Sequence, residues 1–197
     1  MNLDKKYQKS IKRGVSMPEC SCPIINEKKF INKFFDWTGK VFYTQSQPLF
    51  FHVPVNIDTR MNKLMMDVES SGYKIKGPET VIQEDSMFKG KIMIEIEDPK
   101  TDDNNLIRFK ERTRIYSTVF TESWDKLARG VREVTKKLQK KKMKVTKVYF
   151  MHLTCPECAK KRGYKTVIFC KVKEEKKPAK KESIKKTGKK PQKIKKR

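Results

Sequence analysis

The chain has 197 residues, of which 36% are hydrophobic and 36% are charged, and its formal net charge is +25 at pH 7. This length suits one ordinary domain or two small, closely packed ones. No stretch approaches the roughly 18 consecutive apolar residues that a membrane-spanning helix needs. The N-terminus also lacks the apolar core of a signal peptide, so the composition excludes a helical membrane protein and predicts a soluble, cytoplasmic one.

The first segment, residues 1–25, is basic and shows no hydrophobic period. It contains the pair Cys20-Ser21-Cys22, and Pro18 and Pro23 on either side of this pair favour an extended loop. We expect this segment to precede the folded domain, which the later patterns place over residues 26–172.

A helix is predicted over Glu27–Trp37. Asn26 is a suitable N-cap, and Gly39 is a suitable stop. Its apolar face would be broad and aromatic, with Phe30, Ile31, Phe34, Phe35 and Trp37. An aromatic stripe at helical spacing is typical of a core face, although it also suits a ligand or partner surface.

The next part, about residues 41–98, reads as strands and one helix. The helix begins at Asp58 or Thr59, carries apolar residues at helical spacing and ends at Gly72. Ile92, Ile94 and Ile96 alternate with Met93, Glu95 and Glu97, which indicates a strand with one buried face and a second face that is polar or lines a cleft. The predicted strands are Val41–Tyr43, Leu49–Val55, Tyr73–Gln83 and Lys91–Glu97, the last two joined at Asp85–Gly90. The polar residues Asp98–Asn105 then form a connection.

The same order recurs over about residues 112–172. A strand over Arg114–Phe120 precedes a helix that Thr121 or Ser123 caps. That helix has the apolar stripe Trp124, Leu127, Ala128, Val131, Val134 and Leu138. Two strands follow, Lys144–Thr154 and Tyr164–Val172, with Cys155-Pro156-Glu157-Cys158 at the hairpin tip between them.

Both parts are therefore strand, helix, strand, strand, which indicates an internal duplication. We predict an α+β fold in which the two pseudo-repeats form an antiparallel sheet with helices packed on one face. The N-terminal helix would precede them, and residues 173–197 would follow as a disordered basic tail. From Lys171 to Arg197 there are fourteen Lys or Arg against three Glu, so this end cannot bury enough apolar surface to fold.

The paired cysteines favour a structural zinc site made by Cys20, Cys22, Cys155 and Cys158. Zinc prefers four tetrahedral ligands with sulfur at about 2.3 Å, and the two residues inside C-x-x-C let both thiolates face one ion. A redox dithiol, a disulfide and unrelated small apolar residues stay open as alternatives. Cys170 lies inside an apolar strand and is assigned to the core.

A duplicated strand-helix-strand-strand unit of the SHS2 type, here Val41 to Val172, resembles the GyrI-like small-molecule-binding family. This family includes the effector domain of BmrR-type transcription regulators. The resemblance implies that two units pair around a pseudo-twofold axis and bind amphipathic ligands in the cleft between them. Members commonly use a buried Glu on a late strand, whereas the late strand Thr166–Cys170 has none.

If the cleft binds a ligand, alternation predicts its lining. Aromatic walls would come from Tyr43, Phe51, Tyr116 and Trp124, and a charge that attracts a cation would come from Glu95 or Glu97. Each of these residues also has a structural interpretation: Trp124 as core, and the two Glu as a solvated strand face. The predicted function is binding of a small cationic or amphipathic molecule.

Two other functions bear on this sequence. The chain lacks G-x-S-x-G, H-E-x-x-H and a Gly-rich phosphate loop, so no motif predicts an enzyme. Some GyrI-like proteins are reported as hydrolases, however, and catalysis by a Glu and Tyr pair in the cleft stays open as an alternative. The alternative function is nonspecific nucleic-acid binding, in which Lys173–Arg197 would contact phosphates. That tail supplies charge without aromatic residues for stacking, and it equally suits a solubilising extension.

Overall fold

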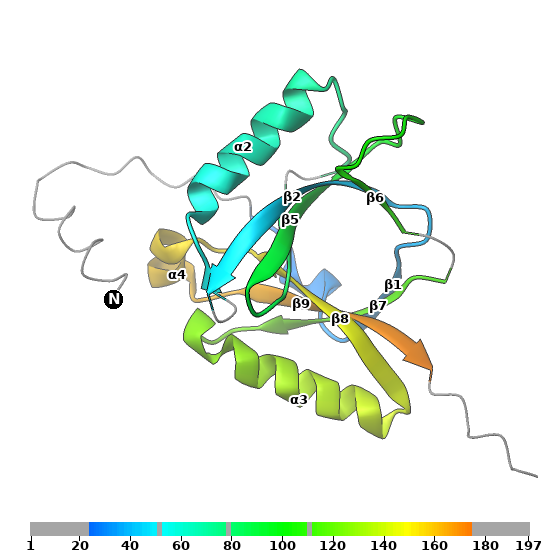
Figure 1. The fold of residues 1–197 in the computed structure, drawn as a ribbon. Coiled ribbons are helices and arrows are strands. Elements are labelled where there is room, and N and C mark those ends of the chain that lie inside the picture. Colours follow the sequence, from blue (N-terminus) through cyan, green and yellow to red (C-terminus); the bar gives the residue numbers. More distant parts are fainter. Residues whose placement is uncertain (1–23, 51–52, 78–79, 110–111, 175–197) are drawn as a thin grey trace, which may run out of the picture.

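The computed structural model describes residues 24–50, 53–77, 80–109 and 112–174. The chain forms a 3-10 turn η1 (Glu27–Lys29) and then one curled antiparallel sheet with three helices outside it (Figure 1). The helices are α2 (Ile57–Ser70), α3 (Leu127–Lys140), which the short turn η2 (Trp124–Lys126) precedes, and α4 (Pro156–Arg162). The strands are β1 (Lys33–Asp36), β2 (Val41–Phe50), β3 (Val53–Pro54), β4 (Ile82–Glu84), β5 (Lys89–Ile96), β6 (Leu106–Arg108), β7 (Arg114–Phe120), β8 (Met143–His152) and β9 (Thr166–Glu174).

The strand order in the sheet is β1-β7-β9-β8-β4-β5-β2-β3, and β6 pairs with β2. Its centre reads β7-β9-β8 followed by β4-β5-β2, which is one strand-helix-strand-strand unit beside the reverse of the other. The two units meet where β4 pairs with β8, at Gln83 opposite Phe150 and Glu84 opposite Tyr149. The predicted α+β class with two pseudo-repeats is confirmed, and we call this junction the seam.

The two long helices cover the outer face of the curl, as predicted. From α2, Leu64 and Val68 pack in one core cluster with the alternating β5 residues Ile92, Ile94 and Ile96, all at most 1% exposed. From α3, Val134 and Leu138 pack against a second cluster that includes Phe150, Ile168 and Cys170. Each helix therefore buries the apolar stripe that its sequence carries, which is what holds an amphipathic helix on a sheet.

The inner, concave face of the curl holds a third cluster. It contains Trp37, Phe42, Ile82, Met93, Phe109, Ile115, Tyr149, Met151, Leu153, Val167 and Phe169. Residues of one strand alternate between the faces: on β9, Val167 and Phe169 lie in this inner cluster, while Ile168 and Cys170 lie in the outer one. A sheet buried on both faces explains the apolar run Val167–Cys170 within β9.

The helix predicted over Glu27–Trp37 is wrong. Asn26 does cap a turn, accepting a hydrogen bond from the Lys28 N–H at 3.1 Å, but that turn ends after Lys29. Asn32 then takes a left-handed φ of 54°, and β1 pairs with β7. The backbone hydrogen bonds of an open sheet edge thus override the helical spacing of the aromatic residues.

Three further differences concern strands. Val41–Tyr43 and the start of the predicted Leu49–Val55 belong to one long strand, β2, which ends at Phe50. The predicted strand Tyr73–Gln83 is reduced to a bridge at Ile75 and the short β4, because the chain turns at Gly77 with φ 80°. Strand β6 was not predicted; it directly follows the expected polar connection.

The Cys155-Pro156-Glu157-Cys158 segment begins a helix rather than only turning a hairpin. Cys155 is the N-cap of α4, and its Sγ accepts a hydrogen bond from the Cys158 N–H at 3.4 Å. Pro156 occupies the first turn, where its fixed φ suits a helix, and Gly163 ends the helix with φ 75°. The predicted tail, Lys173–Arg197, lies almost wholly outside the described residues. No described helix is long and apolar enough to cross a membrane.

Candidate functional site: the concave face of the sheet

Trp37 lies at the centre of the concave face. It follows β1, and its backbone N–H donates to the Thr113 carbonyl at 2.9 Å. Its side chain is 4% exposed. Four aromatic rings surround it with centroids at 5.2–5.5 Å, namely Phe42, Phe109, Tyr149 and Phe169. Rings at these separations pack favourably beyond their buried area, so this residue organises the inner core.

A first pocket, about 190 Å³ in volume, lies on one side of Trp37. We call it the aromatic pocket, because rings dominate its wall. It is lined by Ile25, Phe30, Phe35, Trp37, Lys40, Phe42, Lys76, Thr80, Ile82, Glu95, Met151 and Phe169. Its polar lining residues are Lys40, Lys76, Thr80 and Glu95. Two of them form an ion pair, in which Lys40 Nζ lies 2.7 and 2.6 Å from the two Glu95 carboxylate oxygens. The carboxylate is therefore held by a cation on a mostly apolar surface.

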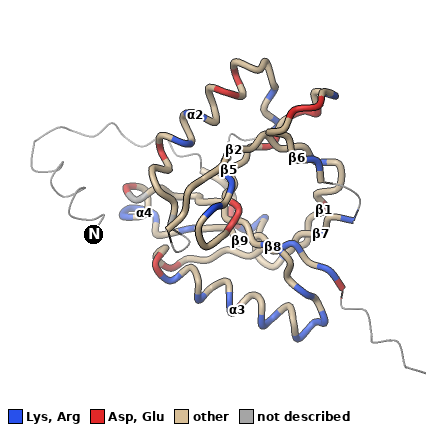
Figure 2. Tube along the Cα trace, viewed as in Figure 1, with Lys and Arg blue, Asp and Glu red and all other residues tan. Residues whose placement is uncertain are grey.

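A second pocket, about 390 Å³ in volume, is lined by Glu84, Met93, Ile107, Arg108, Phe109, Arg112, Thr113, Lys147, Tyr149, Lys171 and Lys173. We call it the basic pocket, because five of these described lining residues are Lys or Arg and one is acidic. Figure 2 shows the basic positions on β6 and on β8 and β9. The carboxylate of Glu84 accepts from Lys147 Nζ at 2.7 Å. Each pocket has one β4 residue in its lining, Ile82 in the aromatic pocket and Glu84 in the basic pocket.

The electrostatics of the basic pocket follow from burial. Burial raises the pKa of Tyr149 well above its usual range, and the Glu84 carboxylate opposite it acts in the same direction. The Tyr149 hydroxyl therefore stays protonated at neutral pH. Burial, and then the charges of Lys147 and Lys173, lower the pKa of Lys171.

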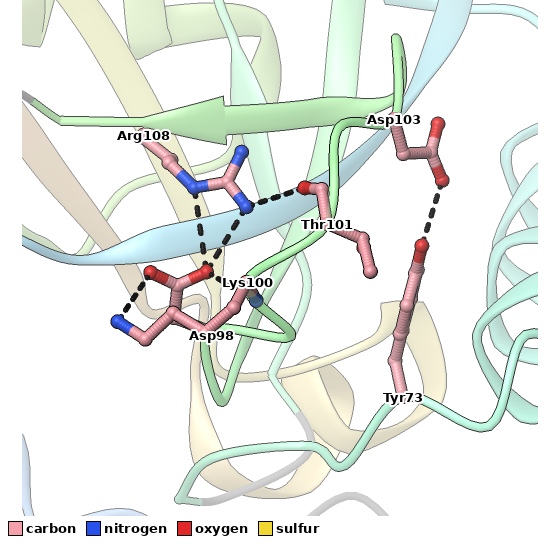
Figure 3. A network of polar contacts seen from close by, with 6 residues as sticks. All are labelled: Tyr73, Asp98, Lys100, Thr101, Asp103 and Arg108. Atoms are coloured by element: carbon pink, nitrogen blue, oxygen red, sulfur yellow. Dashed lines mark hydrogen bonds and ion pairs between the residues drawn. The ribbon is translucent and has the colours of Figure 1, made fainter.

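A polar network fixes the connection from β5 to β6 beside the basic pocket (Figure 3). Asp98 Oδ1 accepts from the Arg108 guanidinium at 3.0 Å and from the Lys100 backbone N–H at 3.0 Å. Arg108 also donates to the Thr101 carbonyl at 2.7 Å. These hydrogen bonds, with the backbone bond to Lys100 first among them, lower the pKa of Asp98 to about 2. The network keeps β6 on β2 and thereby positions Ile107 and Phe109 in the pocket wall.

The five predicted ligand residues that the structure describes do not lie together. Glu95 lines the aromatic pocket. Tyr43 and Tyr116 are buried on the outer face under α2 and α3, and Tyr116 donates to Asn32 Oδ1 at 2.6 Å. Trp124 packs against His152 and Tyr164, with ring centroids at 5.2 and 5.7 Å. Glu97 is exposed just after β5, and Phe51 lies outside the described residues.

The predicted metal ligands are only partly described. Cys155 is half-buried and Cys158 is buried at the start of α4, and each makes contacts within the protein. Cys20 and Cys22 lie outside the described residues. Within the described part of the chain, no group of three or more His, Cys, Asp or Glu has metal-site geometry. The four-cysteine zinc site therefore stays a prediction.

Sequence reasoning missed Trp37, Phe109, Tyr149, Lys147 and Lys171. The signal for one of them was present, because Lys171 alternates on β9 with Cys170 and Val172 of the outer core. Trp37 lies in the segment that was wrongly predicted as a helix. Tyr149 lies in a predicted strand, but the sequence does not show which face of that strand it occupies, so neither residue could be placed on the inner side. Without a pairing register, aromatic residues of the two faces look alike.

Comparisons with known proteins give one family and one fold. A protein-family model described as "Bacterial hydrolase" matches residues 12–172. The crystal structure of the EcmrR C-terminal domain is similar at a TM-score of 0.55 and 10% identity, covering 74% of this chain and 98% of that one. EcmrR in the cryo-EM structure of an EcmrR–DNA complex in EcmrR-RPo is similar at 0.52 and 9%, covering 87% of this chain and 63% of that one. No curated protein matches the sequence. The EcmrR domain is GyrI-like, so the resemblance found in the element order is confirmed for the fold.

Proposed function

The chain belongs to the bacterial hydrolase family, and from this premise we propose that it binds a small molecule on the concave face of its sheet. The observation that carries the proposal is the aromatic pocket beside Trp37, where rings surround a paired carboxylate. A largely apolar pocket with few polar groups is the usual form of a small-molecule site. The GyrI-like resemblance supports this proposal, because it implies ligand binding between the two repeats.

The ligand of this pocket is proposed to be amphipathic and cationic. Its apolar part would contact Phe30, Phe35 and Phe169, and its charge would take the place of the Lys40 ammonium at Glu95. Aromatic faces add to the attraction of a cation. The side chains of Lys40 and Glu95 are 32% and 22% exposed, so the pair is accessible to a competing charge.

Tryptophan fluorescence tests this proposal. The chain has two Trp, so Trp124→Phe leaves Trp37 as the reporter. Titration with tetraphenylphosphonium is expected to change its emission saturably. In that background, Glu95→Gln should weaken binding about tenfold, because the counter-charge is lost, whereas Lys40→Gln should strengthen it. Glu69→Gln, which removes the same charge from an exposed position of α2, should change nothing. Equal affinity in the Glu95 and Glu69 variants would contradict the proposal.

Hydrolysis is the second candidate function, and one pair of residues favours it. Glu84 and Tyr149 lie opposite each other across the seam, and both line the basic pocket. Glu84 would accept a proton from a water molecule while the water oxygen bonds to an acyl carbon, and the Tyr149 hydroxyl would donate to the oxyanion. The proton would then pass from Glu84 to the leaving oxygen as its bond to carbon breaks.

This candidate is tested with a panel of p-nitrophenyl esters. General-base catalysis contributes about 10²–10⁴-fold, so Glu84→Gln should lower kcat by at least about a hundredfold. Tyr149→Phe should lower kcat without a matching rise in KM, since it removes only the donor to the oxyanion. Glu69→Gln serves again as the control. Turnover that persists in the Glu84 variant would rule out this mechanism.

We also propose that Cys20, Cys22, Cys155 and Cys158 hold a structural zinc ion. What supports this is the backbone N–H of Cys158 directed at Cys155 Sγ, because hydrogen bonds from outside the ligand set orient and stabilise a thiolate. Such a site would be closed by its four sulfur ligands and would leave no position for a reacting water. Its role would be to fasten the N-terminal segment, apart from the ligand pockets.

A further inference from the structure

The lining of the basic pocket has more positively charged side chains than its acidic side chain can neutralise. Its described lining includes Lys147, Lys171 and Lys173 on neighbouring strands, and Glu84 is the acidic residue among them. Glu84 pairs with Lys147 at 2.7 Å. The guanidinium of Arg108 is paired with Asp98, which does not line the pocket. The ammonium group of Lys171 therefore lies in the pocket lining beside other positively charged side chains.

The position of Lys147 is the result of a break in the strand alternation. On β8, Tyr149 and Met151 face the concave side, whereas Met143 and Val145 belong to the outer cluster with α3. All four positions are odd-numbered, so a regular strand would keep them on one face. The ladder with β9 shifts between Val145 and Lys147, which is a β-bulge. The bulge turns Lys147 into the pocket, and bulges commonly redirect a side chain next to a functional site.

This arrangement is unfavourable in the absence of an anion. Lys147 is the direct cross-strand partner of Lys171, and like charges directly opposite each other destabilise a sheet. Burial and the neighbouring ammonium groups lower the pKa of Lys171, and its Nζ lies 5.5 Å from the centroid of the Phe109 ring. An anion placed between the ammonium groups would relieve their repulsion.

We propose that the basic pocket binds a small organic anion, whose carboxylate or phosphate lies among Lys147, Lys171 and Lys173. The apolar part of the molecule lies against Ile107, Phe109 and Tyr149. The pocket volume of about 390 Å³ falls within the range of small-molecule sites. This site is separate from the aromatic pocket, and its ligand has the opposite charge, so it does not depend on the cationic ligand proposed there.

Calorimetric titration with benzoate, phenyl phosphate and the neutral analogue benzyl alcohol tests the inference. At least one of the two anions should bind, and benzyl alcohol should bind at least tenfold more weakly; the two anion arms distinguish a carboxylate ligand from a phosphate ligand. Lys171→Gln should weaken binding of the anion about tenfold, and Lys173→Gln should do so to a smaller extent. Glu84→Gln should strengthen it several-fold, because it removes the competing carboxylate and frees Lys147.

The matched control is Lys136→Gln, which removes the same charge from the exposed side of α3. Circular dichroism establishes that each variant is folded, and the gain expected for Glu84→Gln cannot arise from a folding defect. Equal binding of benzyl alcohol and the anions would overturn the inference, as would equal losses in the Lys136 and Lys171 variants. The second result would mean that overall basicity, rather than the pocket, attracts anions.

Discussion

Gly130 shows how closely α3 approaches the sheet. A Cβ built on this residue would lie 2.6 Å from Cδ2 and 2.8 Å from Cε2 of the Phe120 ring, and 3.3 Å from Ile168 Cδ1. Gly normally weakens a helix interior by about 0.5–1 kcal/mol relative to Ala. Its presence in the buried stripe of α3 is explained by this close contact with the sheet.

Gly130→Ala is therefore expected to destabilise the protein by about 1 kcal/mol, because overpacking costs about 1–3 kcal/mol and exceeds the gain in helix propensity. Urea unfolding monitored by circular dichroism measures the change. Gln139→Ala, at an exposed position of the same helix, should be neutral or slightly stabilising. A Gly130→Ala protein more stable than the wild type would show that the ring of Phe120 moves aside without cost.

The cysteine residues give a second prediction at this scale. Elemental analysis of purified protein should find about one zinc ion per chain, and Cys155→Ser should lose the metal and unfold at lower temperature, because structural zinc is coupled to folding. Cys170→Ser is the control for metal content. Cys170 is fully buried in the outer cluster, where burial raises its thiol pKa to about 12, so it is a core residue. Metal-free wild type with a reversibly oxidised Cys155–Cys158 pair would identify a redox dithiol instead.

Among the secondary-structure elements, the connection from β5 to β6 contains the carboxylate of Asp98, which accepts several hydrogen bonds. Hydrogen bonds lower the pKa of Asp98 to about 2 from a usual 3.8. A lowered pKa in the folded state means that the ionised form stabilises the fold above pH 3.8, and that this contribution is lost as the pH falls towards 2. Because the same residue orients Arg108, the network links the stability of β6 to the wall of the basic pocket.

We expect Asp98→Asn to lower the melting temperature at pH 7, with a difference from the wild type that shrinks between about pH 4 and pH 2. Thermal denaturation at a series of pH values measures it. Asp102→Asn, which alters a neighbouring exposed carboxylate in the same connection, is the matched control. If the difference in melting temperature is constant over this pH range, the stabilisation by Asp98 does not depend on the ionisation of its carboxyl group.

The elements that the sequence predicted well are those whose apolar periodicity agrees with their tertiary position. Both amphipathic helices and the alternating strand β5 fall into this class. The predicted helix starts were less accurate, because Asn56 precedes α2 and Lys126 precedes α3, and neither makes a side-chain cap hydrogen bond. The N-terminal helix was wrong because Phe34 and Phe35 have helical spacing as well as strand propensity, and pairing with β7 decides between them. The two pockets could not be predicted, since they depend on the bulge after Val145 and on which face of the curl each aromatic residue occupies.

At the scale of the whole molecule, charge is distributed unevenly. Figure 2 shows Lys and Arg along α3 and towards the end of β9. The net charge of +25 belongs to the full chain, whose basic C-terminal segment lies mostly outside the described residues. Charge of this kind attracts nucleic acid without reading its sequence. The concave-face pockets, by contrast, are lined by residues of the described part of the chain.

Truncation after Glu174 separates these two properties. The shortened protein should lose any salt-dependent binding to random duplex DNA, because the counterion release that drives it is lost with the Lys residues. Its binding of tetraphenylphosphonium and of benzoate or phenyl phosphate should be unchanged. Fluorescence anisotropy and calorimetry measure the two activities. Loss of small-molecule binding on truncation would mean that the tail takes part in the sites proposed on the concave face.

The seam has one more consequence. β4 and β8 are in register at two residue pairs, Gln83 with Phe150 and Glu84 with Tyr149, whereas β8 and β9 pair along nearly their whole length. The two repeats are thus joined by a short seam, and separating them at the seam would break few hydrogen bonds. A molecule bound in either pocket would contact both repeats, because each pocket has residues from β4 and from β8 in its wall. A bound ligand would therefore stabilise the pairing of β4 with β8. Slower amide hydrogen exchange at Gln83 and Glu84 would report this stabilisation.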